Sequence, residues 1–426
     1  MSTAGVLGAL AGALGSDQVR EGGPADAVGG LVPAAVAAPA DLDGAAAALG
    51  VASHEGLAVL VRGGGSKAGW GAPPGRLDVV LETSRLDAVV AHEAADFVLT
   101  CQAGVTLARL GELLAPHRQR LCLDPPEEGA TLGGVIATGA AGPLRFRYGT
   151  PRDLVLGATA VLGDGTVARA GGKVVKNVAG YDLAKLYCGS FGTLALVGEL
   201  TVRLHPAPPA RATLRATLAP DGLAPALSAL RAAQAASEPS ALELDWPDSA
   251  PPRLLVLLEG RPAALGERLA ALQSALSPLA GTETLGGDEA AGAWAGHARF
   301  FRHRPPPPWA RLHLSLPPAG LAGALAGLRQ RAGELGVACD LGGAAGNGSL
   351  DAVLSGRDDA SLAAAAAAAA ELAGAAAGFS QLRGADPSLP PAPPALPAAT
   401  LALMAEVKRR FDPTGVLAPG RLGAGW

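Results

Sequence analysis

Two glycine-rich stretches place the strongest constraint on how this chain of 426 residues can fold. The first reads VRGGGSKAGWG over residues 61–71, and the second reads TLGGVIATGAAG over residues 131–142. Because glycine lacks a Cβ, consecutive backbone N–H groups can converge on one point, an arrangement that binds phosphate groups. Two such stretches predict a cofactor that is held at more than one point.

The first stretch does not fit two familiar phosphate-binding motifs. A Rossmann fingerprint opens a helix, whereas Pro73 and Pro74 follow these glycines and prevent a helix from beginning. A Walker loop ends in Gly-Lys-Ser or Gly-Lys-Thr, but the order here is Gly65-Ser66-Lys67. Two interpretations remain: a purely structural turn, or a loop whose N–H groups, hydroxyl and ammonium face a pyrophosphate.

The composition indicates a globular protein with more than one domain. Hydrophobic residues make up 49% of the chain, the net charge is -4, and the 34 Lys and Arg are dispersed, which argues against nucleic-acid binding. The cysteines follow no zinc or iron–sulfur spacing, which fits a reducing compartment. An apolar N-terminal run is too short to cross a bilayer. We therefore expect a cytoplasmic location.

Changes in composition divide the chain into four segments. We expect an N-terminal extension at 1–39 and an α+β domain at 40–206, which ends at the prolines after His205. Residues 207–388 alternate strands with alanine-rich helices, as in a smaller α+β domain. A proline-rich linker and a helix over 398–411 follow within 389–426.

Local patterns predict most of the individual elements. In the first domain, strands are expected at 57–61, 79–81, 88–92, 97–102, 154–162 and 194–204. A helix over 106–114 begins at a Thr106 N-cap, and Gly163-Asp164-Gly165 forms a hairpin turn. In the second domain, helices are expected at 223–236, 265–276, 321–335 and 362–377.

A series of motifs in a fixed order resembles the FAD-binding domain of the p-cresol methylhydroxylase and vanillyl-alcohol oxidase type. The motifs are Arg62-Gly63-Gly64-Gly65-Ser66, Pro125-Pro126, Thr131-Leu132-Gly133-Gly134, Arg147-Tyr148-Gly149, Leu162-Gly163-Asp164-Gly165 and Gly189-Ser190-Phe191-Gly192-Thr193-Leu194. The resemblance implies a two-subdomain FAD-binding domain, then an α+β cap domain, then a C-terminal helical segment that returns to the FAD domain.

Within that superfamily the chain is most similar to the FAD-binding E subunit of glycolate oxidase. The similarity rests on residues 173–186, on 297–317 and on Phe411-Asp412-Pro413 with Pro419-Gly420-Arg421. It implies oxidation of glycolate, a 2-hydroxy acid, to glyoxylate together with a D-type FAD subunit and an iron–sulfur subunit. It also implies an association with the inner face of the membrane through those partners.

The resemblance also implies which residues hold FAD. The residues facing the pyrophosphate would be Arg62, Gly63, Gly64, Gly65, Ser66, Lys67, Thr131, Leu132, Gly133 and Gly134, with Pro125 in the same set. Ala137, Thr138 and Gly142 would lie along the ribityl chain and flavin, and Gly149 and Val197 would border the adenine or the ring. Covalent relatives often carry a His in or beside the first loop, where this chain has Ser66, so we expect non-covalent FAD.

The substrate site is less defined by the sequence. Oxidation of a 2-hydroxy acid needs a cation for the carboxylate and a base for the hydroxyl proton. Residues of the right type are Arg145, Arg147, Tyr181, Lys185, Arg302, His303 and Arg421, although solvated surface charge is the simpler interpretation for each.

Two departures from the family pattern leave alternative functions open. Relatives that oxidise hydroxy acids directly carry a histidine-rich cap segment that binds metal, whereas residues 342–350 here contain no histidine, and His297 and His303 make a poor metal pair. We therefore expect no metal. Ala418 also replaces the usual Asn. The alternatives are an electron-relay or assembly subunit without its own substrate site, and a stand-alone FAD-dependent hydroxy-acid or alditol oxidase.

Overall fold

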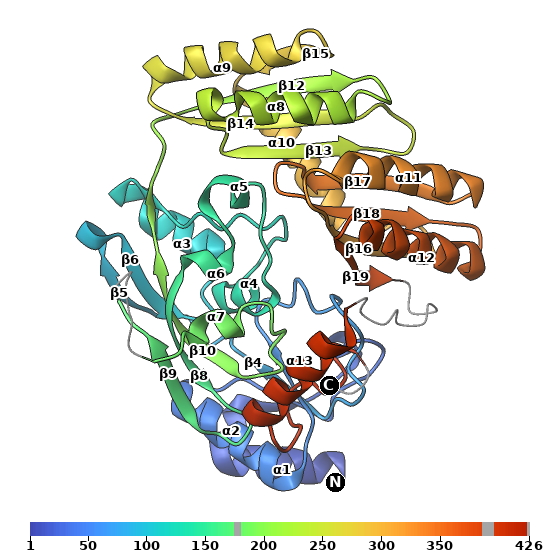
Figure 1. Cartoon of the computed structure of the whole chain (residues 1–426). Helices are drawn as coiled ribbons and strands as arrows, with labels where there is room; N and C mark the ends of the chain where they lie inside the picture. The colour runs from blue at the N-terminus through green and yellow to red at the C-terminus, as the bar shows by residue number, and fades with distance from the viewer. Residues whose placement is uncertain (174–179, 386–395, 424–426) are drawn as a thin grey trace. The chain divides into compact units, whose positions relative to one another are not determined.

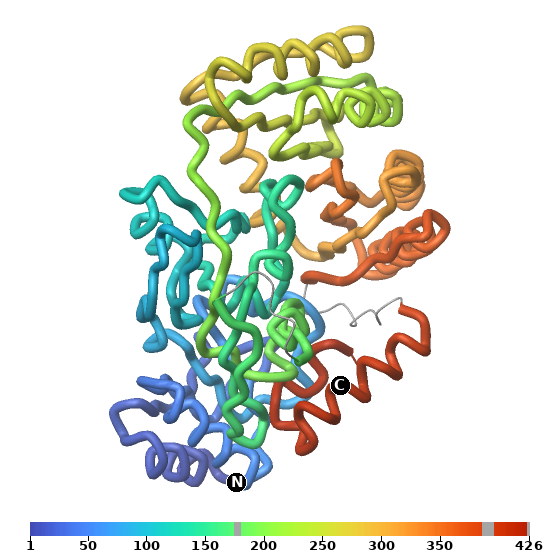
Figure 2. The backbone as a smooth tube through the Cα atoms, turned by 60° about the vertical axis from the view of Figure 1, so that its left-hand side comes forward, coloured from blue at the N-terminus to red at the C-terminus, as the bar shows by residue number. Residues whose placement is uncertain are grey.

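The computed structural model describes residues 1–173, 180–385 and 396–423, and the chain forms two compact units. Unit 1 comprises Met1–Ala141, Gly149–Ala207 and Leu396–Trp426, and unit 2 comprises Gly142–Tyr148 and Pro208–Ala395. Figure 2 shows the C-terminal residues, in red, among the blue and green residues of unit 1. Residues 174–179, which contribute to the similarity to the E subunit, lie outside the described residues. The predicted linker at 389–394 also lies outside them.

Unit 1 contains two larger sheets, as expected for a two-subdomain domain. The first has the order β1-β2-β4-β3, from Val19–Glu21, Ala35–Ala37, Val79–Glu82 and Val59–Arg62. β4 pairs in parallel with both β2 and β3. The second has the order β5-β6-β10-β8-β9, from Val89–Glu93, Val98–Gln102, Leu196–Arg203, Val155–Val161 and Val167–Gly171, and is antiparallel throughout.

Helices α1 (Thr3–Leu14) and α2 (Leu42–Glu55) pack beside the first sheet. α2 begins at Asp41, whose side chain accepts a hydrogen bond from the amide of Gly44, and ends at Gly56 in the left-handed conformation. Val6 and Leu10 of α1 are buried in the same apolar cluster as strand residues. The residues expected to form an N-terminal extension therefore contribute to the core of unit 1.

The elements predicted for the second sheet of unit 1 are present. Strands β5, β6, β8 and β10 overlap the predicted ranges, and α3 (Leu107–Leu114) begins at Thr106, whose hydroxyl accepts from the amide of Arg109. The Asp164 side chain accepts from the amide of Thr166 between β8 and β9, as a hairpin turn requires. Short strands β7 (Gln119–Arg120) and β11 (His205–Pro206) pair at the end of the first domain.

Unit 2 is built on one antiparallel sheet of eight strands in the order β15-β12-β14-β13-β17-β18-β16-β19 (Figure 1). The strands are Ala280–Leu285, Ala210–Leu218, Arg253–Gly260, Ala241–Trp246, Ala338–Ala344, Ser349–Ser355, Trp309–Ser315 and Phe379–Ala385. The helices are α5 (Arg145–Tyr148), α8 (Leu223–Ser237), α9 (Pro262–Leu276), α10 (Gly287–Arg302), α11 (Leu321–Glu334) and α12 (Asp359–Ala375).

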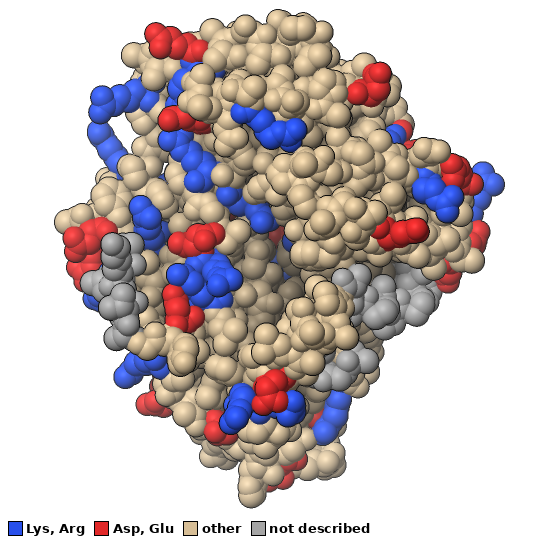
Figure 3. All heavy atoms as spheres, in the orientation of Figure 1, with Lys and Arg blue, Asp and Glu red and all other residues tan. Residues whose placement is uncertain are grey.

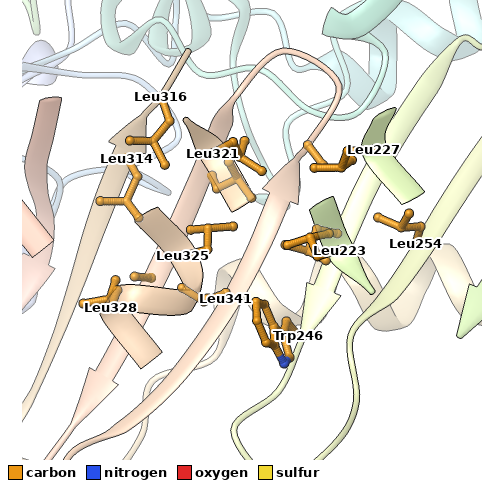
Figure 4. Close-up of a cluster of buried hydrophobic side chains, with 14 of the residues drawn as sticks. Leu223, Leu227, Trp246, Leu254, Leu314, Leu316, Leu321, Leu325, Leu328 and Leu341 are labelled. Carbon is orange, nitrogen blue, oxygen red and sulfur yellow. The ribbon is translucent and has the colours of Figure 1, made fainter. Parts of the chain in front are cut away.

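The two faces of this sheet differ in polarity because side chains alternate along each strand. Leu254 and Leu314 lie on the face that packs against α8 and α11, where Leu223 and Leu321 join them in the core (Figure 4). The intervening residues Glu243, Asp245, Arg311, His313 and Asp351 bring charged and polar groups to the other face, which α10 partly covers. Unit 2 therefore has an apolar core on one side of its sheet and an ionic layer on the other.

Charged residues are dispersed over the visible surface. Figure 3 shows Lys and Arg interspersed with Asp and Glu on the face that it draws. Among the described residues, no helix is long and apolar enough to cross a membrane.

Candidate functional site

Both glycine-rich stretches line one pocket in unit 1. The pocket is partly open to solvent, and the space within it, open solvent included, is about 770 Å³. Its walls come from the loop after β3, from α4 (Leu132–Thr138), and from residues that follow β4 and β6. Segment 191–197, which leads into β10, and Arg421 near the C-terminus complete it. The structure thus brings together segments that are far apart in the sequence.

The first glycine stretch supplies a run of unused hydrogen-bond donors. The amide N–H groups from Gly63 to Lys67 donate to no protein acceptor within the part of the chain that the structure describes. Gly64 and Gly65 are exposed at the pocket, so a ligand can reach their backbone. A run of accessible backbone donors without protein acceptors is suited to binding an anionic ligand.

The glycines of this stretch are also required by close packing. A Cβ at Gly63 would lie 2.2 Å from Oγ1 of Thr131, and one at Gly64 would lie 2.0 Å from the carbonyl oxygen of Gly129. Gly65 has a φ of +72°, in the region that favours glycine. The glycines therefore also have a structural role, because the absent side chains let the first stretch touch Thr131 and the preceding Gly129.

The second stretch differs from the expected exposed backbone. It forms α4, in which Thr131 caps the amide of Gly134 at 3.2 Å. The amides of Leu132 and Gly133 donate to the carbonyls of Val105 and Ala103 at 2.9 and 2.8 Å. The first amides of α4 are thus already bonded to protein atoms. This stretch offers the pocket the surface of a short helix, not a row of open donors.

The two cations of the first stretch are neutralised by carboxylates. The Arg62 guanidinium lies 2.7 Å from Asp26 and 2.6 Å from Glu82. The buried ammonium of Lys67 lies 3.5 Å from Glu127. Burial lowers the pKa of Lys67, and the Glu127 carboxylate opposes that shift. Neither cation therefore brings a net positive charge to the pocket.

Arg421 is a third cation in the lining and has different partners. Its guanidinium donates to the backbone carbonyls of Ala68 and Ala72, the latter at 3.2 Å. The residue is 5% exposed, and burial lowers the pKa of its guanidinium to about 10. Arg421 was a sequence candidate for holding a substrate carboxylate, and the structure places it beside the first glycine stretch.

Most residues expected to hold FAD line this pocket. They are Arg62, Gly63, Gly64, Gly65, Ser66, Lys67, Thr131, Gly133, Gly134, Ala137, Thr138 and Val197. Among the described residues, Pro125 and Gly149 are absent from the lining, Leu132 is fully buried in the core, and Gly142 belongs to unit 2. Leu132 faces away because α4 turns its apolar side inward.

Several lining residues were missed from the sequence. Phe191, Gly192 and Ala195 line the pocket, and the first two belong to a motif that carried the family resemblance, so the motif was the available signal. Thr83 and Ala103 follow β4 and β6 directly. No sequence pattern distinguishes those two from other residues at strand ends.

Apart from Arg421, the candidates for the substrate site are dispersed and lie outside the pocket lining, as far as the described residues show. Tyr181 is 91% exposed, and Lys185 forms an ion pair with Asp182 at 2.9 Å. In unit 2, Arg147 donates to the hydroxyl of Ser240 at 3.3 Å, and Arg302 and His303 lie at the end of α10. Each position fits a surface or structural role.

Two histidines of unit 2 take part in ionic networks that the sequence did not reveal. His297 Nδ1 lies 2.6 Å from Asp245, and Nε2 lies 2.9 Å from Glu243. Burial opposes the imidazolium, but these two carboxylates outweigh it and raise the pKa of His297 to about 10. His313 Nδ1 lies 2.9 Å from Asp351, yet burial and Arg383 lower the pKa of His313 to about 4.

These networks do not form an evident metal centre. Across the described ranges, no group of three or more His, Cys, Asp or Glu side chains is arranged to hold a metal ion. The His297 network consists of one cation between two carboxylates, which is a self-contained ion cluster.

Two family models match parts of the chain. Residues 33–171 match a model described as "FAD binding domain", and residues 395–422 match one described as "FAD linked oxidases, C-terminal domain". The first covers both glycine stretches, and the second covers Arg421.

Relatives with curated names match about two fifths of the chain. D-lactate dehydrogenase of Archaeoglobus fulgidus is 39% identical over 171 residues, which cover 40% of this chain and 38% of that protein. Glycolate oxidase subunit GlcE of Escherichia coli is 37% identical over 159 residues, covering 37% of this chain and 45% of that subunit. The matched region thus spans less than half the length of each relative.

Solved structures extend the similarity to nearly the whole fold. A substrate-bound structure of p-cresol methylhydroxylase has a TM-score of 0.78 at 14% identity, covering 99% of this chain and 96% of that one. A 4-ethylphenol oxidase from Gulosibacter chungangensis has a TM-score of 0.73 at 15% identity, covering 99% and 97%. The chain therefore has the α+β fold of p-cresol methylhydroxylase with its cap domain, and its residues 33–171 are similar to an FAD binding domain.

Proposed function

We propose that this chain is the FAD-binding subunit of a glycolate oxidase or dehydrogenase complex. In this proposal it oxidises glycolate to glyoxylate together with a D-type flavoprotein and an iron–sulfur partner. The run of unbonded amides from Gly63 to Lys67 carries the cofactor part of the proposal. The similarity to GlcE supports the glycolate part.

The residues of the pocket fit a dinucleotide. Five consecutive N–H donors suit a diphosphate, and the apolar walls from Ala103, Ala137 and Ala195 suit the flat faces of a flavin. No His or Cys occurs in the pocket lining within the described residues, which supports non-covalent attachment. FAD, when bound, would accept the hydride that leaves the hydroxyl-bearing carbon.

The protein's own contribution would be to bind and orient. Backbone amides 63–67 would hold the diphosphate, and Thr138 would border the ribityl chain. The hydroxyl of Thr138 donates to the Gly134 carbonyl at 2.6 Å, so its oxygen stays free to accept from a ligand hydroxyl.

The class of substrate is inferred from the relatives together. Their names include D-lactate dehydrogenase, glycolate oxidase subunits and D-2-hydroxyglutarate dehydrogenase, all of which refer to 2-hydroxy acids or their oxidation. We infer a 2-hydroxy acid as the substrate of this chain or of the complex in which it acts.

The test is to purify the full chain and record its absorption spectrum before and after anaerobic addition of glycolate. We expect a flavin spectrum that glycolate bleaches when the partner subunits are present. Lack of any flavin after reconstitution with FAD would contradict the cofactor assignment. A flavin that stays oxidised with glycolate and the partners would contradict the substrate assignment alone.

A stand-alone D-lactate dehydrogenase is a second candidate. It is favoured by the D-lactate dehydrogenase of Archaeoglobus fulgidus, whose identity of 39% is similar to that of GlcE. It predicts that D-lactate bleaches the flavin of the isolated chain. Bleaching that requires the partners would instead favour the complex.

A further inference from the structure

The charges around the pocket do not balance. Arg20 and Arg62 together are compensated by Asp26 and Glu82, because Asp26 pairs with both arginines, and Lys67 is compensated by Glu127. Arg421 has no carboxylate within 4.0 Å among the described residues, and its guanidinium donates to the carbonyl oxygens of Ala68 and Ala72. One buried positive charge therefore remains at the pocket.

A buried and uncompensated guanidinium is unfavourable. Removing an ion from water costs several kcal/mol, and carbonyl dipoles recover only part of that energy. The lowered pKa of Arg421 has the same physical origin, since burial disfavours the charged form. An anion in the pocket, beside the unbonded amides, would supply the missing countercharge.

Arg421 also belongs to a segment that forms backbone hydrogen bonds with strand β3 of the first sheet. The amide of Val59 donates to the carbonyl of Val416, and the amide of Ala418 donates to the carbonyl of Val59, both at 2.8 Å. This places residues 416–418 beside β3, which leads into the first glycine stretch. Arg421 therefore joins the end of the chain to the loop of free amides.

We propose that Arg421 provides the countercharge for the diphosphate of the bound dinucleotide, and that cofactor binding thereby stabilises the docking of residues 416–421 against β3. This inference rests on the proposed binding of FAD in this pocket. It assigns an electrostatic contribution to cofactor binding to Arg421, which is distant in sequence from both glycine stretches. It also makes the C-terminal segment part of the cofactor site.

The test compares ligands that share only part of FAD. Calorimetry on the flavin-free full chain would measure FAD, ADP and riboflavin binding to the wild type, Arg421→Met and Arg421→Lys. Arg410→Met is the matched control, because Arg410 is a neighbouring arginine with an 82% exposed side chain. Each titration is repeated at two salt concentrations, since screening weakens ionic contacts.

We expect Arg421→Met to weaken FAD and ADP binding by about 10- to 100-fold, the range for a hydrogen bond to a charged group. Riboflavin, which lacks the diphosphate, should bind both proteins equally. Arg421→Lys keeps the charge and should retain more of the ADP affinity and its salt dependence. Arg410→Met should match the wild type.

Docking of the segment is measured by hydrogen exchange at the amide of Ala418. FAD and ADP should slow this exchange in the wild type, whereas riboflavin should not. The proposal is overturned if both Arg421 variants bind ADP as tightly as the wild type with the same salt dependence, or if riboflavin protects Ala418 as well as ADP does. Failure of the wild type to bind FAD would instead overturn the proposed function.

Discussion

At the scale of single residues, the pocket depends on glycines, which lack side chains, and on cations that are paired with carboxylates. Gly63 and Gly64 let two stretches approach to a distance that no Cβ would permit. Arg62 and Lys67 resemble ligand-binding cations in the sequence, but carboxylates hold both of them. The backbone of this loop, with Arg421, carries the remaining capacity to bind an anion.

Replacing Gly64 with alanine tests the close approach of the two stretches. The new Cβ would meet the Gly129 carbonyl at 2.0 Å, so we expect a loss of about 1–3 kcal/mol in the free energy of unfolding and a loss of bound FAD. Gly69→Ala is the control, because nothing lies within 4 Å of a Cβ there. Urea unfolding and flavin content measure both. Equal stability of the two variants would contradict the packing argument.

His297 gives unit 2 a dependence on pH with a definite sign. Its pKa is raised to about 10 in the folded protein, so its stabilisation is complete below the unfolded value near 6.5 and is lost as the pH rises to about 10. We expect the wild type to lose stability over this range more steeply than His297→Gln. His303→Gln, at an exposed position next to α10, should keep the wild-type slope. Parallel slopes for all three proteins would refute this role.

At the scale of elements, α4 is where sequence and structure differ most. Its sequence, LGGVIAT, contains two glycines and two β-branched residues in a row, so intrinsic helix propensity is low. The helix forms because Thr131 caps it and because Val105 and Ala103 accept its first amides. The cap is a local contact, whereas the bonds to Val105 and Ala103 are tertiary contacts that no local pattern predicts. The strands around it were predicted because short runs of strand-forming residues between glycine turns are a local signal.

Removing the cap of α4 should affect both stability and cofactor binding. Thr131→Ala loses the hydrogen bond to the Gly134 amide, with an expected cost of about 1 kcal/mol in unfolding free energy. Because α4 lines the pocket, FAD affinity should also fall. Thr106→Ala removes the comparable cap of α3, which lies outside the pocket lining, and should lower stability alone. Urea unfolding measures the loss of stability, and FAD titration measures the loss of affinity.

At the scale of the whole molecule, unit 1 is completed by the end of the chain. Lys408 of α13 (Ala398–Phe411) is buried, pairs with Asp412, and donates to the carbonyls of Thr193 and Leu417, both at 2.7 Å. It thus joins α13 to the segment before β10 and to residues beside β3. The sequence predicted a returning helical segment through resemblance alone. It could not identify Arg421 as a pocket residue, since 353 positions separate it from Ala68.

Breaking the ion pair between Lys408 and Asp412 should destabilise the packing of the C-terminal segment in unit 1. Lys408→Met leaves the Asp412 carboxylate buried without its cation, at an expected cost of about 3–5 kcal/mol. Arg409→Met, at an exposed position of the same helix, should cost much less. Thermal unfolding without FAD measures the difference. A Lys408 variant as stable as the Arg409 variant would show that the C-terminal segment is not a stabilising part of unit 1.

The central claim, that the first glycine stretch holds the diphosphate of FAD, is tested most directly by hydrogen exchange of individual amides with and without FAD. The amides from Gly63 to Lys67 have no protein acceptor within the described residues and should become strongly protected when FAD binds. Those of Leu132 and Gly133 are already bonded and should change much less. Unchanged exchange at residues 63–67 in a protein saturated with FAD would contradict the account.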